Sequence, residues 1–525
     1  MNPNQVQKAK KSVCRVMGVH KSYNFREPYL ECETEQFGGT AFFVDPKTTF
    51  GENFPIDTTN KRFALTNFHV VDTLVSQECT LSYPDKGHSM ISAKVVFAVP
   101  SLDIAILLID PFGNHPLWFD SGDIRDFIDG IPNLRLETKN TIKGNSQEVM
   151  AIGFPNLSQD YQLCQGCISG RGLGMIQCTI SLNGGNSGGP LLMKNKVIGI
   201  CTASISDSES LGLAVPINQV VNFFTKWTDY SEIILKTPSW GIEVKTTTPD
   251  YLQYHEIDSA IQGCTVLKTV DVGSIHKAKM KPKDIIMGIR SNGKSFNVDN
   301  YGLISVGWCD KRVPIYNQEF ILSLDPDDIK FTVYKWSTKK IRENIKVNPT
   351  SIPFEICTQY HCWEPIDYTI LGGCVFMDLC MNHLSIDDDD DDPWCPPVQA
   401  MSLTHYLTET MHMQKAVVVT HIPSQGHVSS QNLLKPFHRI VKCNGKKVKS
   451  VNHMESIIAD AVERYNDDYD TIRNRFIVLE TPSDKIYYSL EQLVIQEIQD
   501  SQRPHYPSDK CQLLGLTVRK RRRRY

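Results

Sequence analysis

Ser181-Leu-Asn-Gly-Gly-Asn-Ser187-Gly-Gly-Pro190 carries the strongest structural signal of the chain. Ser187 lies between glycines on a turn, and the apolar runs Leu191-Leu-Met193 and Val197-Ile-Gly-Ile-Cys201 follow it. Glycine permits positive φ angles and tight turns, so several backbone N–H groups can point into one space. Acyl transfer needs this arrangement, because an exposed hydroxyl must lie beside backbone donors that face a developing oxyanion. Most glycine-rich turns are hairpin corners, so the partners of Ser187 have to come from elsewhere in the chain.

Composition places the chain among soluble globular proteins with more than one domain. A length of 525 residues predicts about two to four domains, and 41% hydrophobic with 22% charged residues provides an ample core. The net charge of −4 gives no general attraction to nucleic acids or membranes. The N-terminus lacks an apolar signal segment and no apolar run would span a bilayer, so we expect an intracellular protein, cytoplasmic or nuclear, without membrane contact. The sixteen cysteines show no framework spacing and are expected to be reduced, with no metal or other cofactor.

Short runs rich in β-branched and aromatic residues alternate with turns from residue 12 to residue 230. Strands of this length at this spacing are typical of barrels or sandwiches and not of a βαβ repeat. The helical spacing of Asn218–Trp227 predicts a helix that closes the domain. The predicted strands are Ser12–Val19, Gly39–Val44, Arg62–Thr66, Ser92–Ala98, Ile104–Ile109, Val149–Ile152 and Met175–Ile180.

A histidine and an aspartate precede Ser187, each at the edge of a predicted strand. His69 ends the run Ala64-Leu-Thr-Asn-Phe-His69, and Asp103 opens the run Asp103-Ile-Ala-Ile-Leu107. Serine needs a base that takes up its hydroxyl proton, and the base needs a carboxylate that fixes its tautomer. The order His, Asp, Ser is that of chymotrypsin-type double barrels. Each residue alone would more often be structural, but the ordered set predicts a catalytic triad. Asp72 is too close to His69 in sequence for the third position, and Asp110 lies at the far end of its strand.

Five motifs are similar to those of one known family: Thr66-Asn-Phe-His69-Val-Val71, Leu102-Asp103-Ile-Ala-Ile-Leu107, Ala151-Ile-Gly-Phe-Pro155, Gly185-Asn-Ser187-Gly-Gly-Pro190 and Leu211-Gly-Leu-Ala-Val-Pro-Ile217. Together they resemble the Deg/HtrA family of trypsin-fold, ATP-independent serine proteases, and its plant-type branch in particular. The resemblance covers nearly the whole chain, because the family places PDZ domains after the protease. It implies a mainly β fold with α+β appendages, in which a chymotrypsin-like double β-barrel is followed by two PDZ-like domains.

The resemblance also assigns roles at the site. His69 would act as general base and then as general acid, Asp103 would orient it, and Ser187 would attack the scissile carbonyl of a polypeptide. The backbone N–H groups of Gly185 and Ser187 would form the oxyanion hole. Where the family commonly has proline, this chain has Gly184, which loosens the turn. This departure leaves a second interpretation open: a peptide-binding scaffold or holdase whose triad is poorly assembled.

Substrate preference is expected to be set by Leu182 and Leu213. These residues would line an apolar specificity pocket for a small or medium aliphatic side chain. No acidic residue is placed at the base of this pocket to favour arginine or lysine. Trypsin-like specificity is therefore not expected.

Changes of pattern along the chain predict segments at 1–235, 236–350, 351–515 and a basic tail at 516–525. By the resemblance, the first is the protease domain, the second a PDZ domain and the third a second, divergent PDZ-like domain. By the resemblance, Trp240, Gly241 and Ile242 form the loop that holds the C-terminal carboxylate of a peptide added to a sheet edge. Packing of this PDZ domain on the protease or on another subunit is the alternative. Family members assemble as trimers or multiples of trimers, and aromatic residues near the N-terminus would supply contacts in such a homo-oligomer: Tyr23, Phe25 and Tyr29.

Four further features have competing interpretations. Gly288–Ser295 has P-loop spacing, but no helix is predicted after it, and Ser291-Asn-Gly-Lys294 is expected to form a hairpin turn. Cys164 and Cys167 are expected to lie in a loop near the active site. The Asp387–Asp392 run is either solvated or a site for a cation or a basic partner. The tail Arg519–Arg524 is either a disordered end or a nuclear import or nucleic-acid contact, the one route by which this chain would bind nucleic acid.

Overall fold

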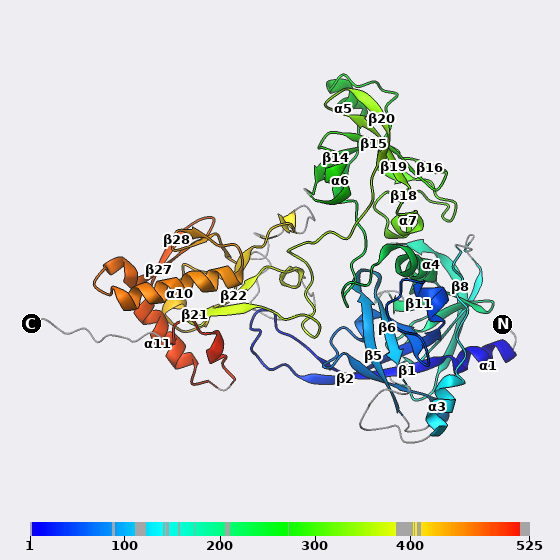
Figure 1. Cartoon of the computed structure of the whole chain (residues 1–525), viewed down its shortest axis with the longest axis horizontal. Coiled ribbons are helices and arrows are strands. Elements are labelled where there is room, and N and C mark those ends of the chain that lie inside the picture. The colour runs from blue at the N-terminus through cyan, green and yellow to red at the C-terminus, as the bar shows by residue number, and fades with distance from the viewer. Residues whose placement is uncertain are drawn as a thin grey trace, which may run out of the picture. The chain divides into compact units, whose positions relative to one another are not determined.

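A computed structural model of the chain describes residues 3–86, 90–110, 122–139, 142, 146–155, 158–172, 174–204, 211–270, 272–384, 403, 405–406, 411–503 and 505–514. The run Asp387–Asp392 and the tail Arg519–Arg524 lie outside these residues. Unit 1 consists of Met1–Lys21 and Thr34–Ile352, and unit 2 consists of Ser22–Glu33 and Pro353–Tyr525 (Figure 1).

Unit 1 begins with a closed six-stranded barrel, in the order β1-β2-β3-β6-β5-β4. The helix α1 (Pro3–Lys11) precedes it and α2 (Pro46–Phe50) follows β2. The central strands are apolar on both faces, as β6 with its sequence Ile-Ala-Ile-Leu-Leu-Ile shows, because they are covered from inside and outside the barrel. The strands are β1 (Val13–Lys21), β2 (Thr34–Val44), β3 (Arg62–Thr66), β4 (Glu78–Ser82), β5 (Met90–Val99) and β6 (Ile104–Ile109).

A second closed barrel follows α3 (Gly122–Asp129), in the order β10-β11-β12-β9-β8-β7. Every strand predicted from the sequence is present in one of the two barrels, and the double-barrel fold is confirmed. The predicted closing helix is α4 (Ile217–Asn222), which the π-helical turn η5 (Phe223–Trp227) continues. The strands are β7 (Glu148–Gly153), β8 (Gln162–Gly172), β9 (Met175–Cys178), β10 (Pro190–Met193), β11 (Lys196–Ser204) and β12 (Gly212–Pro216).

The remainder of unit 1 is a PDZ-like sheet in the order β13-β14-β15-β19-β20, in which β16 also pairs with β15. Ser291 pairs with Lys294 across the β15–β16 turn, so the predicted hairpin is confirmed. The helix α7 (Gln318–Ser323) packs on α4 of the protease barrel (Figure 1). The elements are β13 (Ile242–Lys245), α5 (Pro249–Tyr254), β14 (Cys264–Thr269), α6 (Gly273–Lys277), β15 (Ile285–Ser291), β16 (Lys294–Asn297), β17 (Leu303–Ile304), β18 (Val313–Pro314), β19 (Ile329–Lys335) and β20 (Lys340–Lys346).

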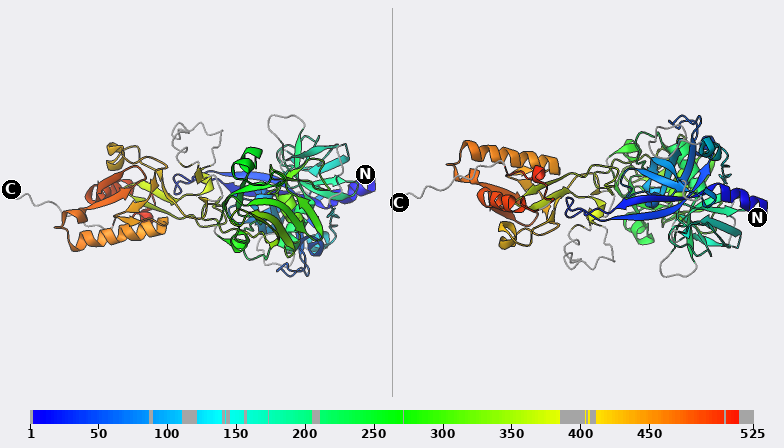
Figure 2. Two further views of the ribbon diagram at one scale, coloured as in Figure 1. Left: turned by 90° about the horizontal axis from the view of Figure 1, so that it is seen from above. Right: turned by 90° about the horizontal axis from the view of Figure 1, so that it is seen from below.

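Unit 2 has two four-stranded sheets, β21-β22-β23-β24 and β26-β25-β27-β28. The long helix α10 (Val451–Asp467), orange in both views of Figure 2, runs along one side of the unit and faces its core with Met454, Ile457 and Ile458. The elements are β21 (Tyr368–Leu371), β22 (Cys374–Asp378), β23 (Val417–His421), α9 (His427–Gln431), β24 (Arg439–Ile440), β25 (Lys442–Cys443), β26 (Lys446–Lys447), β27 (Phe476–Glu480), β28 (Lys485–Ser489) and α11 (Leu490–Asp500).

The aromatic residues near the N-terminus pack within the chain. They lie in Ser22–Glu33, the connection between β1 and β2, which belongs to unit 2. The Tyr23 ring stacks on His361 at 4.8 Å, and Tyr29 meets Tyr506 edge-on at 5.6 Å. Phe25 and Tyr29 also cover the apolar side chains Ile370, Val375 and Met377. These rings therefore have a packing role inside unit 2, and their part in subunit contacts stays a prediction.

Candidate active site

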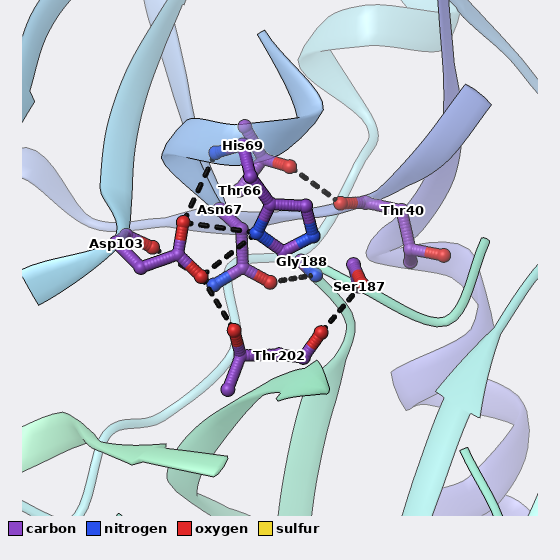
Figure 3. A network of polar contacts seen from close by, with 8 residues as sticks. All are labelled: Thr40, Thr66, Asn67, His69, Asp103, Ser187, Gly188 and Thr202. Carbon is purple, nitrogen blue, oxygen red and sulfur yellow. Dashed lines mark hydrogen bonds and ion pairs between the residues drawn. The ribbon is translucent and has the colours of Figure 1, made fainter. Parts of the chain in front are cut away.

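His69 and Asp103 meet at the end of the first barrel where β3 and β6 pair. His69 lies in the short helix η1 (Phe68–Val70) after β3, and Asp103 lies between η3 (Pro100–Leu102) and β6. Because β3 and β6 are antiparallel neighbours, the residues just beyond their paired ends converge. Nδ1 of His69 is 2.8 Å from Oδ2 and 3.0 Å from Oδ1 of Asp103, and the backbone N–H of His69 donates to Oδ1 at 3.0 Å (Figure 3). A carboxylate only accepts, so Nδ1 is the donor; in the neutral imidazole Nε2 is then the acceptor.

Thr202 in β11 connects this pair to the second barrel. Its Oγ1 donates to Oδ2 of Asp103 at 2.5 Å, so the carboxylate accepts from the His69 ring, the His69 backbone and Thr202. Its carbonyl oxygen accepts a hydrogen bond from the Ser187 hydroxyl at 2.7 Å. One residue of β11 thus contacts both the carboxylate and the serine of the predicted triad.

Ser187 is directed to Thr202 and not to the imidazole in this structure. The His69 ring lies between Asp103 on one side and Ser187 on the other (Figure 3). Among the described residues, no hydrogen bond joins the Ser187 hydroxyl to His69, whose ring bonds go to Asp103. The structure therefore brings the three residues to one place, with the serine hydroxyl in a rotamer that would have to change before proton transfer.

The backbone around Ser187 presents unused donors. In the part of the chain that the structure describes, the N–H groups of Gly185 and Ser187 have no protein acceptor, whereas the next N–H, that of Gly188, donates to the carbonyl of Cys201 at 2.9 Å. Gly185 has a φ of 95°, and a Cβ there would meet the Phe154 carbonyl oxygen at 2.3 Å, so the turn requires glycine. Two free N–H groups flanking Asn186 match the chemistry of an oxyanion site.

The sequence predicts that Gly184 loosens this turn. A Cβ at this position would meet nothing within 4 Å, and its φ is not in the left-handed region. The conformation at residue 184 thus has no need of glycine, unlike that at Gly185.

The other two aspartates do not take the third position. Asp110 directly follows the last residue of β6, at the opposite end of that strand from Asp103. Burial raises the pKa of the Asp72 carboxyl, which makes Asp72 a poorer permanent anion. The carboxylate on Nδ1 of His69 is that of Asp103.

The two predicted pocket residues differ in their surroundings. Leu182 is buried in the core of the second barrel, and a Cβ on Gly212 would meet its side chain at 3.0 Å. Leu213, one residue further along β12, is half-buried. Their role in specificity stays a prediction.

The predicted carboxylate loop lies at the free edge of the PDZ-like sheet. Trp240 is buried, donates Nε1–H to the Ile315 carbonyl at 2.8 Å and contacts Phe331 edge-on. Gly241 has a φ of 67°, and Ile242 begins β13, which has a partner strand on one side only. The peptide-binding role of this loop stays a prediction.

Cys164 and Cys167 lie in β8 and not in the loop that the sequence led us to expect. They pair with Ala151 and Glu148 of β7 in a continuous antiparallel register. The expectation of a loop was wrong because this segment is a strand of the second barrel. The cysteines that the structure describes are free thiols, and the described residues contain no group of histidine, cysteine, aspartate or glutamate side chains suited to a metal ion. No helix among the same residues has the length and apolar character to cross a membrane.

Sequence reasoning missed residues that surround the predicted triad. Thr202 has no motif of its own, and Asn67 lies inside the His69 motif without a role assigned to it.

The sequence also contains no sign of an ion pair between the barrel and the PDZ-like part. Arg171 of β8 and Glu319 of α7 form a buried ion pair with both distances at 2.7 Å. These residues are 148 positions apart, so no local pattern could have paired them.

Two closed barrels with a serine turn and a histidine–aspartate pair between them define the class of trypsin-like peptidases. The family model "Trypsin-like peptidase domain" matches residues 39–200, and the model "PDZ domain" matches residues 358–487. The PDZ match falls on the segment that we expected to be the more divergent of the two.

Within this class the homologues of the chain are Deg/HtrA proteases. It is 22% identical to the mitochondrial protease Do-like 12 of Arabidopsis thaliana over 462 residues, which cover 85% of this chain and 78% of the relative. It is 27% identical to the serine protease Do-like HtrA of Bacillus subtilis over 256 residues, covering 44% and 51%. Among solved structures it is similar to an HtrA-type protease AlgW with decapeptide, at 20% identity, a TM-score of 0.45 and coverage of 67% and 98%.

Proposed function

We propose that this chain is an ATP-independent serine endopeptidase that cleaves unfolded or exposed polypeptides through an acyl-enzyme. The observation that carries the proposal is a chain of hydrogen bonds. His69 is bonded to Asp103, Asp103 accepts from Thr202, and the Thr202 carbonyl accepts from Ser187. With Nδ1 bonded to Asp103, Nε2 is the ring nitrogen on the side of Ser187, where it would serve as the base (Figure 3). The match to the trypsin-like peptidase model and the similarity to Deg/HtrA proteases support the same assignment.

In the proposed reaction the Ser187 hydroxyl turns from the Thr202 carbonyl to Nε2 of His69, gives up its proton there and attacks the peptide carbonyl. The N–H groups of Gly185 and Ser187 donate to the resulting oxyanion, and such a donor contributes about 3–4 kcal/mol. His69 returns the proton to the leaving amine, and a water molecule then repeats the sequence and releases the acyl group. Asp103 stays ionised throughout and stabilises the imidazolium.

Peptide recognition and assembly complete the proposal. Leu182 and Leu213 would contact an aliphatic side chain before the cleaved bond. The loop Trp240–Ile242 and the free edge of β13 would take up a peptide C-terminus as an added strand. The chain would assemble as a trimer or a multiple of trimers, which sedimentation tests, since a mass of 59.4 kDa would identify a monomer.

A second candidate, a peptide-binding scaffold or holdase, is favoured by one observation. The Ser187 hydroxyl donates to Thr202 and not to His69. If this rotamer were fixed, the serine would have no base and the chain would bind polypeptides without cleaving them.

Labelling with a fluorophosphonate probe separates the two candidates, because only an activated serine reacts. The wild-type chain should be labelled on Ser187 and should degrade unfolded casein, and Ser187→Ala should do neither. Ser181→Ala, a change of the same kind in the same loop, is the matched control and should retain both reactions. A wild-type chain without label or casein cleavage would rule out the endopeptidase and leave the scaffold.

A further inference from the structure

Two fully buried polar side chains of the first barrel hold the serine turn of the second barrel. Thr40 lies in β2 and Asn67 lies between β3 and η1, and neither has any exposed surface. Their side chains bond to the backbone of Gly185 and Gly188 in the turn, and the backbone N–H of Thr40 adds a bond to Ser187. Polar groups at this depth are stable only when they are bonded.

Thr40 fixes two carbonyl groups of the turn. Its Oγ1 donates to the Gly185 carbonyl at 2.7 Å, and its backbone N–H donates to the Ser187 carbonyl at 2.8 Å. The same Oγ1 accepts the Phe154 N–H at 3.1 Å, and the Thr40 carbonyl accepts from Oγ1 of Thr66 at 2.8 Å. Every polar atom of Thr40 is therefore committed to a bond of fixed direction, and Figure 3 shows the one from Thr66.

Asn67 fixes the next group of the turn. Its Oδ1 accepts the Gly188 N–H at 2.5 Å, and its Nδ2 donates to the backbone carbonyl of Asp103 at 2.8 Å. One amide thereby connects the serine turn to the residue that bonds His69. The backbone of the serine turn lies close to the backbone of β2, since a Cβ on Gly188 would meet the Thr40 carbonyl oxygen at 1.9 Å.

We propose that Thr40 is a positioning residue, which directs the carbonyls of Gly185 and Ser187 into the first barrel and so keeps the two N–H groups on the other side of the turn aligned for the oxyanion. This inference rests on the proposed endopeptidase function and deepens it. Without Oγ1, the Gly185 carbonyl loses its hydrogen-bond donor and the peptide groups around it can rotate. The loss would act on the transition state, because the oxyanion exists only there.

The test compares four full-length chains: wild type, Thr40→Val, Thr40→Ser and Thr49→Val. Valine keeps the shape of threonine and the backbone N–H but removes Oγ1, and serine restores the hydroxyl. Thr49 is the matched control, because it is equally buried in the same region and its Oγ1 also donates to a backbone carbonyl, that of Asp45 at 2.7 Å. The readouts are kcat and KM for a peptide substrate, and amide hydrogen exchange of residues 183–189.

For Thr40→Val we expect kcat to fall about 10- to 100-fold with KM changed less than about threefold, since the oxyanion donors act on the transition state alone. Exchange in residues 183–189 should rise about tenfold, Thr40→Ser should restore both values, and Thr49→Val should change neither. A folded Thr40→Val chain with wild-type kcat would overturn the positioning role.

Failure of the endopeptidase proposal would give a different pattern of labelling and exchange results. A wild-type chain that does not react with the fluorophosphonate would refute the proposed function whatever the variants do. The exchange measurement still decides about Thr40 in that case: faster exchange in Thr40→Val supports its hold on the turn, and unchanged exchange refutes it.

Discussion

Replacement of Glu319 by glutamine tests the attachment of the PDZ-like sheet to the protease barrels. Glu319 has 1% of its side chain exposed and Arg171 has 10%, and Nη1 of Arg171 lies 2.7 Å from both carboxylate oxygens. Asn218 donates to the same carboxylate at 3.3 Å, and the ring of Trp308 lies 5.3 Å from the guanidinium. Glu319→Gln keeps the shape of the side chain but leaves the buried guanidinium without an anion.

The expected loss in the free energy of opening of α7 follows from the burial of the ion pair. Removing one partner of a buried ion pair costs about 3–5 kcal/mol, because the remaining charge stays in a poorly solvated place. Glutamine can still accept one hydrogen bond, worth about 1 kcal/mol. We therefore expect the free energy of opening of α7 to fall by about 2–4 kcal/mol.

Amide hydrogen exchange of residues 318–323 measures this local opening without assuming that the whole chain unfolds in one step. Glu243→Gln provides the control, because its partner Lys268 is 3.7 Å away and 48% exposed, and such a pair contributes at most about 1 kcal/mol. The double variant Arg171→Met with Glu319→Met should recover most of the loss, since it leaves no buried charge. Protection of α7 in Glu319→Gln within about 0.5 kcal/mol of wild type would refute the argument from burial.

Two more predictions concern pH and glycine. Burial raises the pKa of Glu497 from 4.5 to about 7, so its contribution to the stability of unit 2 is complete below pH 4.5 and is lost as the pH rises through about 7. Protection of α11 against exchange, corrected for the intrinsic rate, should fall by about 3 kcal/mol from pH 5 to pH 8, and Glu497→Gln should abolish this dependence. Gly188→Ala should lose fluorophosphonate labelling, because its Cβ would clash with Thr40 and its φ is 85°. Gly184→Ala should be labelled as the wild type is, because nothing lies within 4 Å of that Cβ; equal labelling of the two variants would contradict the packing argument.

The parts of the fold that the sequence predicts are those that local pattern determines. The strands of both barrels follow from short apolar runs between turns, and the hairpin at Ser291–Lys294 follows from its Asn-Gly pair. His69, Asp103 and Ser187 could be selected because few residue types can act as base, orienting carboxylate and nucleophile. Their separation in sequence did not hide them, since each lies at the edge of a recognisable strand.

Contacts between segments that are far apart in the chain could not be predicted from the sequence. Thr40 and Gly185 are 145 residues apart and Thr202 and Asp103 are 99 apart, and threonine is too common a residue type to mark a site. The placement of Ser22–Glu33 in unit 2 has no local signal either, because its aromatic residues would be equally at home at a subunit contact. A strand pattern predicts what a segment becomes, whereas its partner depends on the whole topology.

The scaffold interpretation depends on how much free energy the rotamer change of Ser187 costs. Turning the hydroxyl away from Thr202 breaks one neutral hydrogen bond, which costs about 1 kcal/mol in net terms, and the new bond to His69 returns a similar amount. Even without that return, about 1 kcal/mol leaves roughly one molecule in six in the competent rotamer and slows the reaction about sixfold. Enzymes accelerate reactions by at least about a millionfold. A resting serine on Thr202 is therefore compatible with an active peptidase, and the scaffold would need a second defect, such as misaligned N–H groups at Gly185 and Ser187.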